Sequence, residues 1–200
     1  IQDWLNQALE AANAVISRGV WQIQTGDPLT VYRDMFIDAD LSDNQEVLWW
    51  KRYDPAAGIG HSITRYLAGG GGLFGASASL VDDYLTRDGR PFVGAEKLEA
   101  KRTYGAELDP TLRDPRLSQT ICMPGQPMGN TNYKFPPLDA TDFNQNTTGY
   151  SMLKYLEINT SNTAAYTTDG QSQAPAIQVR YADVLLNYAE ALAELDGAAN

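Results

Sequence analysis

The sequence is poor in the residues from which most metal and redox sites are built. Its 200 residues include one cysteine, Cys122, and one histidine, His61. A single cysteine excludes an intrachain disulfide and a cysteine-rich zinc site, and a single histidine excludes a metal site with two imidazoles. A Ser-His-Asp arrangement would have to be built around His61 alone. We therefore predict no metal and no cofactor, and we interpret Cys122 as a small buried apolar residue.

Positive charge and long apolar runs are also scarce. The chain has 15 lysine and arginine residues against 25 aspartate and glutamate residues, which gives a formal net charge of −10. This charge repels a polyanion, so we predict no nucleic-acid partner, and docking on anionic lipid is disfavoured. No run of about 18 apolar residues is present, so no segment is predicted to span a bilayer. Neutral ligands are unaffected by these exclusions.

Two long helices are predicted, one near each end of the chain. Residues 1–18 carry an apolar stripe at helical spacing, starting with Ile1, and Gly19 stands where a helix C-terminus is expected. Because this pattern begins at the first residue, we interpret the chain as an excerpt cut from both sides of a longer protein, with any targeting signal outside it.

The second long helix covers residues 180–191 and continues beyond them. Its apolar face is expected to contain Tyr181, Val184, Leu185, Tyr188, Leu192 and Leu195. A line of polar residues follows Arg180, and it is interpreted either as a solvated outer face or as a stripe on which another segment docks: Asp183, Asn187, Glu190 and Glu194. Alanines at packing positions of both long helices favour a closely packed helix pair, as in tetratricopeptide arrays. In the second helix these are Ala182, Ala189 and Ala193.

The residues between the long helices predict shorter elements. Residues 32–40, 79–85 and 97–108 read as short helices, with Ser79 as the N-cap of the second. The apolar run 46–50 is too short to assign to helix or strand. Residues 109–176 lose periodicity and are rich in proline, glycine, asparagine and threonine, so we predict long ordered loops that pack over the helices.

Glycines interrupt the stretch from residue 54 to residue 75, which we predict to be a loop. Four successive glycines occupy positions 69–72. They are not followed by Gly-Lys-Ser/Thr, so a phosphate-binding loop is excluded. Backbone flexibility or close approach to a neighbour is the favoured role.

Arg113, Asp114 and Arg116 surround Pro115 in a compact charged motif. One interpretation is a structural clamp, in which the carboxylate pairs with a neighbouring guanidinium. The other is recognition of a ligand by arginine. We favour the clamp, because two arginines and one aspartate can satisfy one another locally. We also predict that the clamp docks on the polar line of the second long helix, since neither segment has another evident partner.

Several acidic residues raise the possibility of catalysis or cation binding. Asp82, Asp83 and Asp88 are close in sequence, but a glycosidase needs two carboxylates about 5–10 Å apart across a cleft, and nothing places these so. We predict that the chain is not an enzyme, that Asp82 and Asp83 are exposed on a helix, and that Asp88 opens a turn. Residues 142–146 resemble a calcium loop but lack its glycine and its closing glutamate, where Leu153 stands, so loop capping is favoured.

Five segments, taken in order, resemble the SusD/RagB family of Bacteroidetes nutrient-binding outer-membrane lipoproteins. They are Asn44-Gln-Glu-Val-Leu-Trp49, Leu80-Val-Asp-Asp-Tyr-Leu-Thr-Arg-Asp-Gly-Arg-Pro91, Arg113-Asp-Pro-Arg-Leu117, Thr148-Gly-Tyr-Ser-Met-Leu-Lys-Tyr155 and the helix at 180–191. The stretch from residue 54 to residue 74, with Gly60-His61 and Arg65-Tyr66 before the glycines, also resembles members of this family. The resemblance spans nearly the whole chain.

This resemblance implies a mainly α fold, an α/α superhelix of tetratricopeptide-like helix pairs with long irregular loop insertions that form a binding face. Residues 1–200 would be the central fragment of a single SusD-like domain, truncated at both ends. The full protein would be lipid-anchored, facing outward from the cell outer membrane, and would cover a SusC-like TonB-dependent transporter. Its membrane contact would be only through a lipid anchor absent from this fragment.

Aromatic side chains beside the flexible loops are the predicted ligand contacts, mainly because the family binds through loop aromatics. Sugar rings present apolar C–H faces that can lie on indole or phenol rings, and their hydroxyls then need planar polar partners. The predicted contacts are Trp50, Tyr53, Asp54, His61, Arg65, Tyr66 and Phe74. Trp49, which lies in the family motif, is predicted to be buried instead.

The function predicted from this resemblance is non-enzymatic capture of a glycan, an oligosaccharide or starch-like polysaccharide, and its delivery to the transporter for nutrient uptake. The alternative is a helical-repeat module that binds protein or peptide partners, the transporter included, without binding sugar. A carbohydrate-active hydrolase is a third and remote interpretation.

Overall fold

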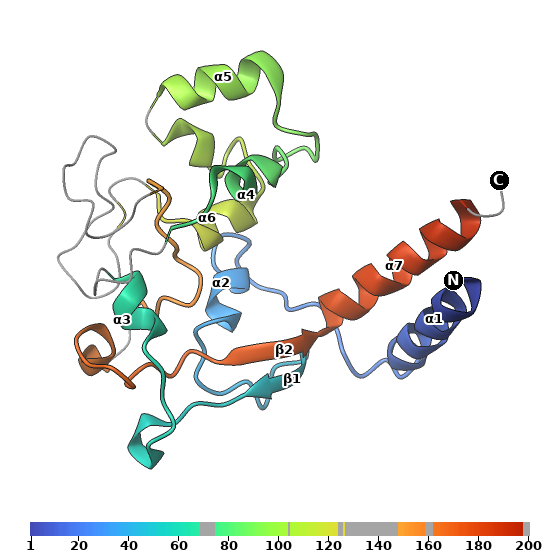
Figure 1. Cartoon of the computed structure of the whole chain (residues 1–200), viewed down its shortest axis with the longest axis horizontal. Helices are drawn as coiled ribbons and strands as arrows, with labels where there is room; N and C mark the ends of the chain where they lie inside the picture. Colours follow the sequence, from blue (N-terminus) through green and yellow to red (C-terminus); the bar gives the residue numbers. More distant parts are fainter. Residues whose placement is uncertain (69–74, 104, 124–125, 127–147, 159–161, 198–200) are drawn as a thin grey trace. The chain divides into compact units, whose positions relative to one another are not determined.

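The computed structural model of the chain describes residues 1–68, 75–103, 105–123, 126, 148–158 and 162–197. The described residues form mainly helices, as predicted, together with two short strands (Figure 1). They fall into two compact units. The first unit comprises residues 1–25, 40–51 and 176–200, and the second unit comprises residues 26–39 and 52–175.

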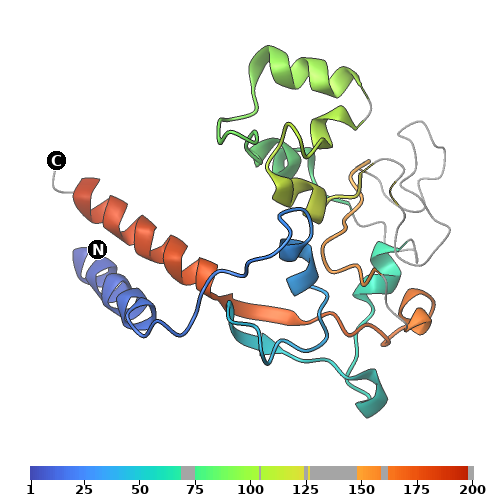
Figure 2. The same cartoon turned by 180° about the vertical axis from the view of Figure 1, so that it is seen from behind.

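The two long helices of the first unit are α1 (Gln2–Ile16) and α7 (Tyr181–Gly197). They lie side by side and antiparallel, with the start of α1 next to the C-terminal part of α7 (Figures 1 and 2). Ala12 of α1 and Ala191 of α7 are buried, and small residues at such positions allow two helices to approach closely. The predicted packed helix pair is therefore confirmed.

Details of both helices differ from the prediction. Ile1 precedes α1 and is 98% exposed, so it does not belong to the buried stripe. In α7 the buried residues are Val184 and Ala191, seven positions apart, whereas the predicted packing residues Ala189 and Ala193 are exposed. A seven-residue spacing returns to the same side of a helix, so the contact line of α7 runs through these two residues.

The apolar run at residues 46–50 forms a strand. β1 (Val47–Lys51) pairs antiparallel with β2 (Ala176–Arg180), and the register is irregular around Trp49. Burial alternates along β1 from Leu48 to Lys51, so the two neighbouring tryptophans differ in exposure. Trp49 is 66% exposed and Trp50 is half-buried. The prediction that Trp49 is buried is therefore wrong.

Polar contacts fix the junction of β2 and α7. Arg180 ends the strand, and its backbone N–H donates to Oδ2 of Asp183 at 2.9 Å, so an aspartate three residues on caps the helix start. The guanidinium of Arg180 donates to the buried carboxylate of Glu46 at 2.9 Å. The first residue of the predicted polar line is thus structural, whereas Asn187, Glu190 and Glu194 are exposed.

The second unit contains short helices joined by irregular segments. They are α2 (Val31–Met35), α3 (Ile63–Leu67), α4 (Ala78–Asp83), α5 (Gly94–Arg102), α6 (Pro115–Thr120) and the 3-10 helices η1 (Pro55–Ala57), η2 (Ala106–Leu108) and η3 (Thr163–Tyr166). The helices predicted near residues 32, 79 and 97 are present with shifted bounds. Ser77, not Ser79, caps α4 by accepting the N–H of Leu80 at 3.2 Å. Only loops were predicted where η1, α3, α6 and η3 lie.

Two apolar clusters form the core of the second unit. One contains Leu67, Cys122, Leu153 and Leu156, and the other contains Ala76, Val81, Leu108, Leu117 and Ile121. Cys122 is completely buried, as predicted, and burial raises the pKa of its thiol to about 12. Within the described parts of the chain, every helix is too short or too polar to span a bilayer.

Candidate functional site

The predicted ligand contacts are distributed over both units. Trp50 belongs to β1 in the first unit. Five others belong to the second unit, and these are Tyr53, Asp54, His61, Arg65 and Tyr66. Phe74 lies outside the described residues, as do the glycines at 69–72 and the calcium-like stretch at 142–146.

Residues 60–65 are held against residues 169–174, and we call this pair of segments the clip. His61 and Ser172 exchange backbone hydrogen bonds of 3.4 and 2.8 Å. The N–H of Thr64 donates to Oγ of Ser172 at 3.0 Å. A Cβ atom at Gly60 would stand 1.9 Å from the carbonyl oxygen of Gly170, so only glycine allows this approach.

His61 acts within the clip through both ring nitrogens. Nδ1 accepts the N–H of Ile63 at 3.2 Å, and Nε2 lies 2.8 Å from the carbonyl oxygen of Ala174. Because one nitrogen accepts and the other faces an acceptor, Nε2 carries the proton and the ring is neutral. The ring of Tyr53 meets the imidazole edge to face, at a centroid distance of 4.4 Å. His61 thereby positions Tyr53, and a ligand hydroxyl would have to displace one of its present partners.

Arg65 and Tyr66 converge on a carboxylate that the sequence analysis missed. Nη1 of Arg65 lies 2.7 Å from Oδ2 of Asp169. This guanidinium lowers the pKa of the Asp169 carboxyl, and hydrogen bonds from Ser62 and Tyr66 lower it further. The dipeptide Asp169-Gly170 is a turn signal, but nothing local in the sequence links it to Arg65.

A buried glutamate anchors the clip from behind. Oε1 of Glu157 accepts hydrogen bonds from the hydroxyl of Thr64 at 3.0 Å and from the N–H groups of Gln173 and Ala174 at 2.7 and 3.0 Å. Three donors on one oxygen satisfy a buried carboxylate well. Asp54 has a comparable local role, since its Oδ1 caps η1 by accepting the N–H of Ala56 at 3.0 Å.

The arrangement combines aromatic rings with polar groups. Tyr53, Arg65 and Tyr66 lie within one short stretch, where both rings are half-buried, and Arg65 pairs with Asp169 of the facing segment, so the site offers both donors and acceptors. Within the described residues, no group of three or more histidine, cysteine, aspartate or glutamate side chains is placed to hold a metal ion. A neutral guest with flat apolar faces and hydroxyl groups matches these features.

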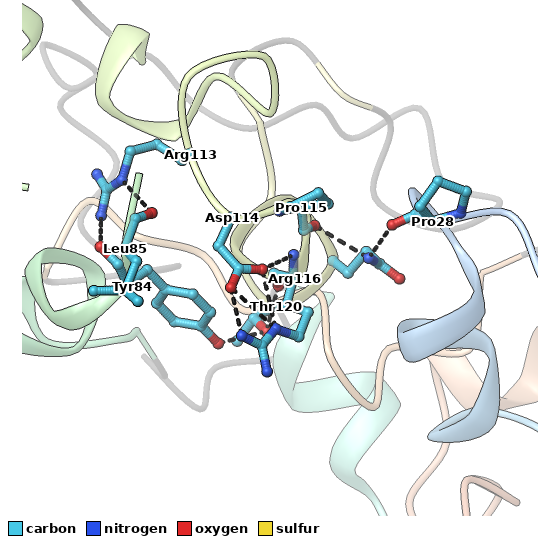
Figure 3. Close-up of polar contacts among 9 residues, drawn as sticks. Pro28, Tyr84, Leu85, Arg113, Asp114, Pro115, Arg116 and Thr120 are labelled. Atoms are coloured by element: carbon cyan, nitrogen blue, oxygen red, sulfur yellow. Dashed lines mark hydrogen bonds and ion pairs between the residues drawn. The ribbon is translucent and has the colours of Figure 1, made fainter. Parts of the chain in front are cut away.

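The motif at residues 113–116 confirms the predicted local clamp, whereas its predicted docking on α7 stays a prediction. Asp114 caps α6 through the N–H of Arg116 at 2.9 Å and also accepts Nε of the same arginine at 3.0 Å, which is the predicted local clamp (Figure 3). Arg113 is used within the second unit. Its buried guanidinium donates to the carbonyls of Val81, Tyr84 and Glu107 at 2.6, 2.7 and 2.8 Å. Carbonyls near the end of α4 lack helical donors, and this explains the choice of partner.

Asp82 also differs from the prediction. It is half-buried instead of exposed, and it pairs with Lys97 at 2.7 Å and with Lys101 at 2.9 Å, both on α5. Burial alone would raise the pKa of Asp82, but the two lysines more than offset this effect and lower it. Asp83 is exposed as predicted, and Asp88 lies in the predicted turn, where it accepts from the hydroxyl of Thr86 at 2.6 Å.

Comparisons with known proteins identify one family. The model of the SusD family matches residues 39–200. A SusD-like carbohydrate binding protein from Bacteroides fragilis NCTC 9343 has a similar structure, with a TM-score of 0.73 and 23% sequence identity, over 98% of this chain and 37% of that one. A second SusD-like protein from the same organism gives a TM-score of 0.67 and 20% identity, over 96% and 40%.

The chain thus spans less than half the length of either similar structure. No protein of curated function matches it. The family model covers most of the chain, and the similar structures share its mainly helical fold. This chain belongs to the SusD family.

Proposed function

We propose that this chain is part of a non-enzymatic protein that binds an oligosaccharide at the outer surface of the outer membrane and delivers it to a SusC-like TonB-dependent transporter. The observation that carries the proposal is membership of the SusD family over residues 39–200. The similarity of the fold to a SusD-like carbohydrate binding protein supports the same ligand class. We also propose that the chain is the central fragment of a single SusD-like domain, and that the full protein is lipid-anchored.

The proposed contact surface is the clip together with Tyr53, Asp54 and Tyr66, which lie on either side of its first segment. The rings of Tyr53 and Tyr66 would lie against sugar C–H faces, while Arg65 and Asp169 would meet the hydroxyls. The side chains of His61 and Asp54 would act mainly by holding these groups in place, since each is already used within the fold. Such prior fixation reduces the entropy that binding must offset.

In the first unit, the exposure of the two neighbouring tryptophans adds a second candidate for sugar contact. Trp50 was predicted as the ligand contact, and it is half-buried on β1. The indole of Trp49 is far more exposed, and exposed indole rings are effective stacking platforms for sugars. We therefore propose Trp49 in addition to Trp50.

Calorimetric titration of the chain with maltoheptaose, xylohexaose and mannohexaose tests this proposal. Tyr53→Ala and Tyr66→Ala should each weaken binding of the saccharide that binds wild type by about tenfold, equal to about 1.4 kcal/mol. Tyr53→Phe keeps the ring and should retain most affinity. Tyr188→Ala, a half-buried tyrosine of α7, is the matched control. Saccharide binding that is unchanged in both alanine variants would remove this surface from the site.

A second candidate function, binding of a protein or peptide helix, is supported by a groove between α1 and α7. The groove has a volume of about 480 Å³, and its walls are mostly small and apolar, from Leu5, Ala8, Ala11, Ala12, Val15, Val184, Asn187, Glu190, Ala191 and Glu194. Apolar grooves of this kind accept amphipathic helices. An array carrying both saccharides and peptides separates the two functions, since peptide binding without any saccharide binding would favour the second.

A further inference from the structure

The motif at residues 113–116 forms one wall of a hollow in the second unit. The hollow has a volume of about 230 Å³ and is lined by Tyr32, Leu80, Asp83, Tyr84, Leu85, Asp114 and Arg116. None of the predicted ligand contacts that the structure describes is among these residues. We propose that this hollow is a second binding site, which accepts a single neutral sugar ring of a glycan. This inference rests on the proposed function.

Apolar surface is available in the lining of the hollow. Leu80 and Leu85 are each 40% exposed, and the rings of Tyr32 and Tyr84 are half-buried. Two leucines and two tyrosines around so small a volume provide the flat apolar contacts that a pyranose ring needs. Ligand pockets for larger molecules have volumes of about 300–1,000 Å³, so this hollow suits one ring rather than an extended chain.

The walls are fixed before any ligand arrives. The hydroxyl of Tyr84 is hydrogen-bonded to Oγ1 of Thr120 at 3.0 Å (Figure 3). Gln119 is buried in α6, and its Oε1 accepts the N–H of Tyr32 at 2.9 Å, while its Nε2 donates to the carbonyl of Pro28 at 2.9 Å. The start of α2 is thereby tied to α6, and the aromatic walls need little reorganisation on binding.

Polar groups of opposite kind complete the lining. Asp114 holds Nε of Arg116, but the side chain of Arg116 is 62% exposed, so part of its guanidinium is accessible to a ligand. Asp83 presents an exposed carboxylate. A guanidinium N–H can donate to a sugar oxygen and a carboxylate can accept from the neighbouring hydroxyl, which is the pattern that a vicinal diol requires.

Charge selects a neutral ring over a charged one. The lining carries two carboxylates and one guanidinium, and Nζ of Lys154 lies 2.9 Å from the hydroxyl of Tyr32 at its margin. These four charges balance. An anionic ring would find Arg116 already paired with Asp114 and would meet the repulsion of Asp83 and of a chain with net charge −10. A cationic ring would meet Arg116 and Lys154.

Methyl NMR on the wild-type chain tests the site without any substitution. The chain carrying ¹³C-methyl leucine is titrated with maltose, cellobiose, xylobiose, mannobiose and, as the acidic probe, digalacturonate. At least one neutral disaccharide should shift the methyl signals of Leu80 and Leu85, and digalacturonate should shift neither. The inference would be overturned if these methyl shifts showed that digalacturonate binds more tightly than every neutral sugar.

A pair of matched variants then tests the location. Leu80→Phe fills the hollow and should weaken binding of the disaccharide by at least tenfold, whereas Leu98→Phe, at a more exposed leucine of α5, should not. Tyr53→Ala should leave the Leu80 response unchanged. If a saccharide binds and Tyr53→Ala weakens that binding, while the methyl signals of Leu80 and Leu85 do not shift, the inference fails and the proposed function stands. If no saccharide binds at all, both fail.

Discussion

Replacing Arg113 by alanine should destabilise the second unit strongly, although the residue lies in a motif that looks like a surface salt bridge. Its side chain is completely buried, and it donates hydrogen bonds to the carbonyls of Val81, Tyr84 and Glu107, at 2.6 to 2.8 Å. Its guanidinium carbon lies 3.8 Å from the centre of the Phe92 ring. Arg113, which lies just before α6, thus ties the start of α6 to α4, to η2 and to Phe92.

The magnitude follows from the groups that alanine would leave without partners. Three buried carbonyls that lose a donor cost about 1 kcal/mol each, and loss of the stack on Phe92 costs about 1 kcal/mol more. The expected loss in the free energy of unfolding is therefore about 4 kcal/mol. Burial lowers the pKa of Arg113, which shows that desolvation opposes the charge, so summing full charge-assisted bond energies would overshoot.

The assay must report on the correct unit. The four tryptophans, Trp4, Trp21, Trp49 and Trp50, all lie in the first unit, so tryptophan fluorescence monitors that unit. Hydrogen exchange of the amide of Ile121, which donates to the carbonyl of Leu117, monitors the second. In Arg113→Ala the exchange protection should fall by about three powers of ten, the equivalent of about 4 kcal/mol.

Arg116→Ala is the matched control, because it removes an arginine from the same motif. Its side chain is mostly exposed and its pair with Asp114 is solvated, so the cost should stay below about 1 kcal/mol. Arg113→Lys keeps the charge but reaches fewer carbonyls, and it should fall between the two. Equal effects of Arg113→Ala and Arg116→Ala would refute the reasoning.

Three further predictions concern other parts of the second unit. Gly60→Ala should disrupt the clip and lower the melting temperature by several degrees, because its Cβ would meet the carbonyl of Gly170, whereas Gly58→Ala, with φ of +75° and open space, should cost only about 1 kcal/mol. Cys122 should resist a thiol reagent such as DTNB in the folded chain and react fully in urea, since burial raises its pKa to about 12; fast reaction of the folded chain would contradict this. Arg116 lowers the pKa of Asp114, so the stability that this pair contributes should be present above the ordinary carboxyl pKa of about 4 and be lost as the pH falls through the lowered value. Unfolding midpoints between pH 2 and 5 should show this dependence, and Asp114→Asn should reduce it.

The sequence predicted the long helices because their signal is local. α1 and α7 repeat apolar residues every three or four positions over at least four turns, and Gly19, with φ of +62°, stands just beyond α1 as expected. α6 was missed for a different reason. It lies in the stretch 109–176, which was predicted as loops because its periodicity is lost, although a proline in the first turn after an aspartate N-cap is a helix start signal.

Long-range pairing explains the errors that no local pattern could have prevented. Which of Trp49 and Trp50 is exposed depends on the register of β1 with β2, whose residues lie more than 120 positions later. The partner of Arg65, Asp169, is likewise distant in sequence. Arg113 was expected to pair with a carboxylate, but it donates hydrogen bonds to backbone carbonyls. Which carbonyls lack a backbone donor is determined only by the folded structure.

The polar residues of the candidate site are largely occupied within the fold, and this has a consequence for ligand recognition. Both nitrogens of His61 are bonded, Asp54 caps η1, and Arg65 is paired. Direct hydrogen bonds to a glycan would therefore be few, and ring contacts would provide most of the affinity. Single ring contacts are weak, at about 1 kcal/mol each.

Affinity should consequently depend on the number of rings that a glycan presents. Where the clip surface and the hollow beside Tyr84 bind rings of one glycan, the second contact becomes intramolecular, and affinity should rise by about 10²-fold or more between a disaccharide and a chain long enough to reach both. A calorimetric series from two to eight sugar units of the saccharide that binds measures this rise. Leu80→Phe should flatten the series without abolishing binding, because it blocks only the hollow. A series that is already flat in the wild-type chain would mean that one ring site accounts for all of the binding.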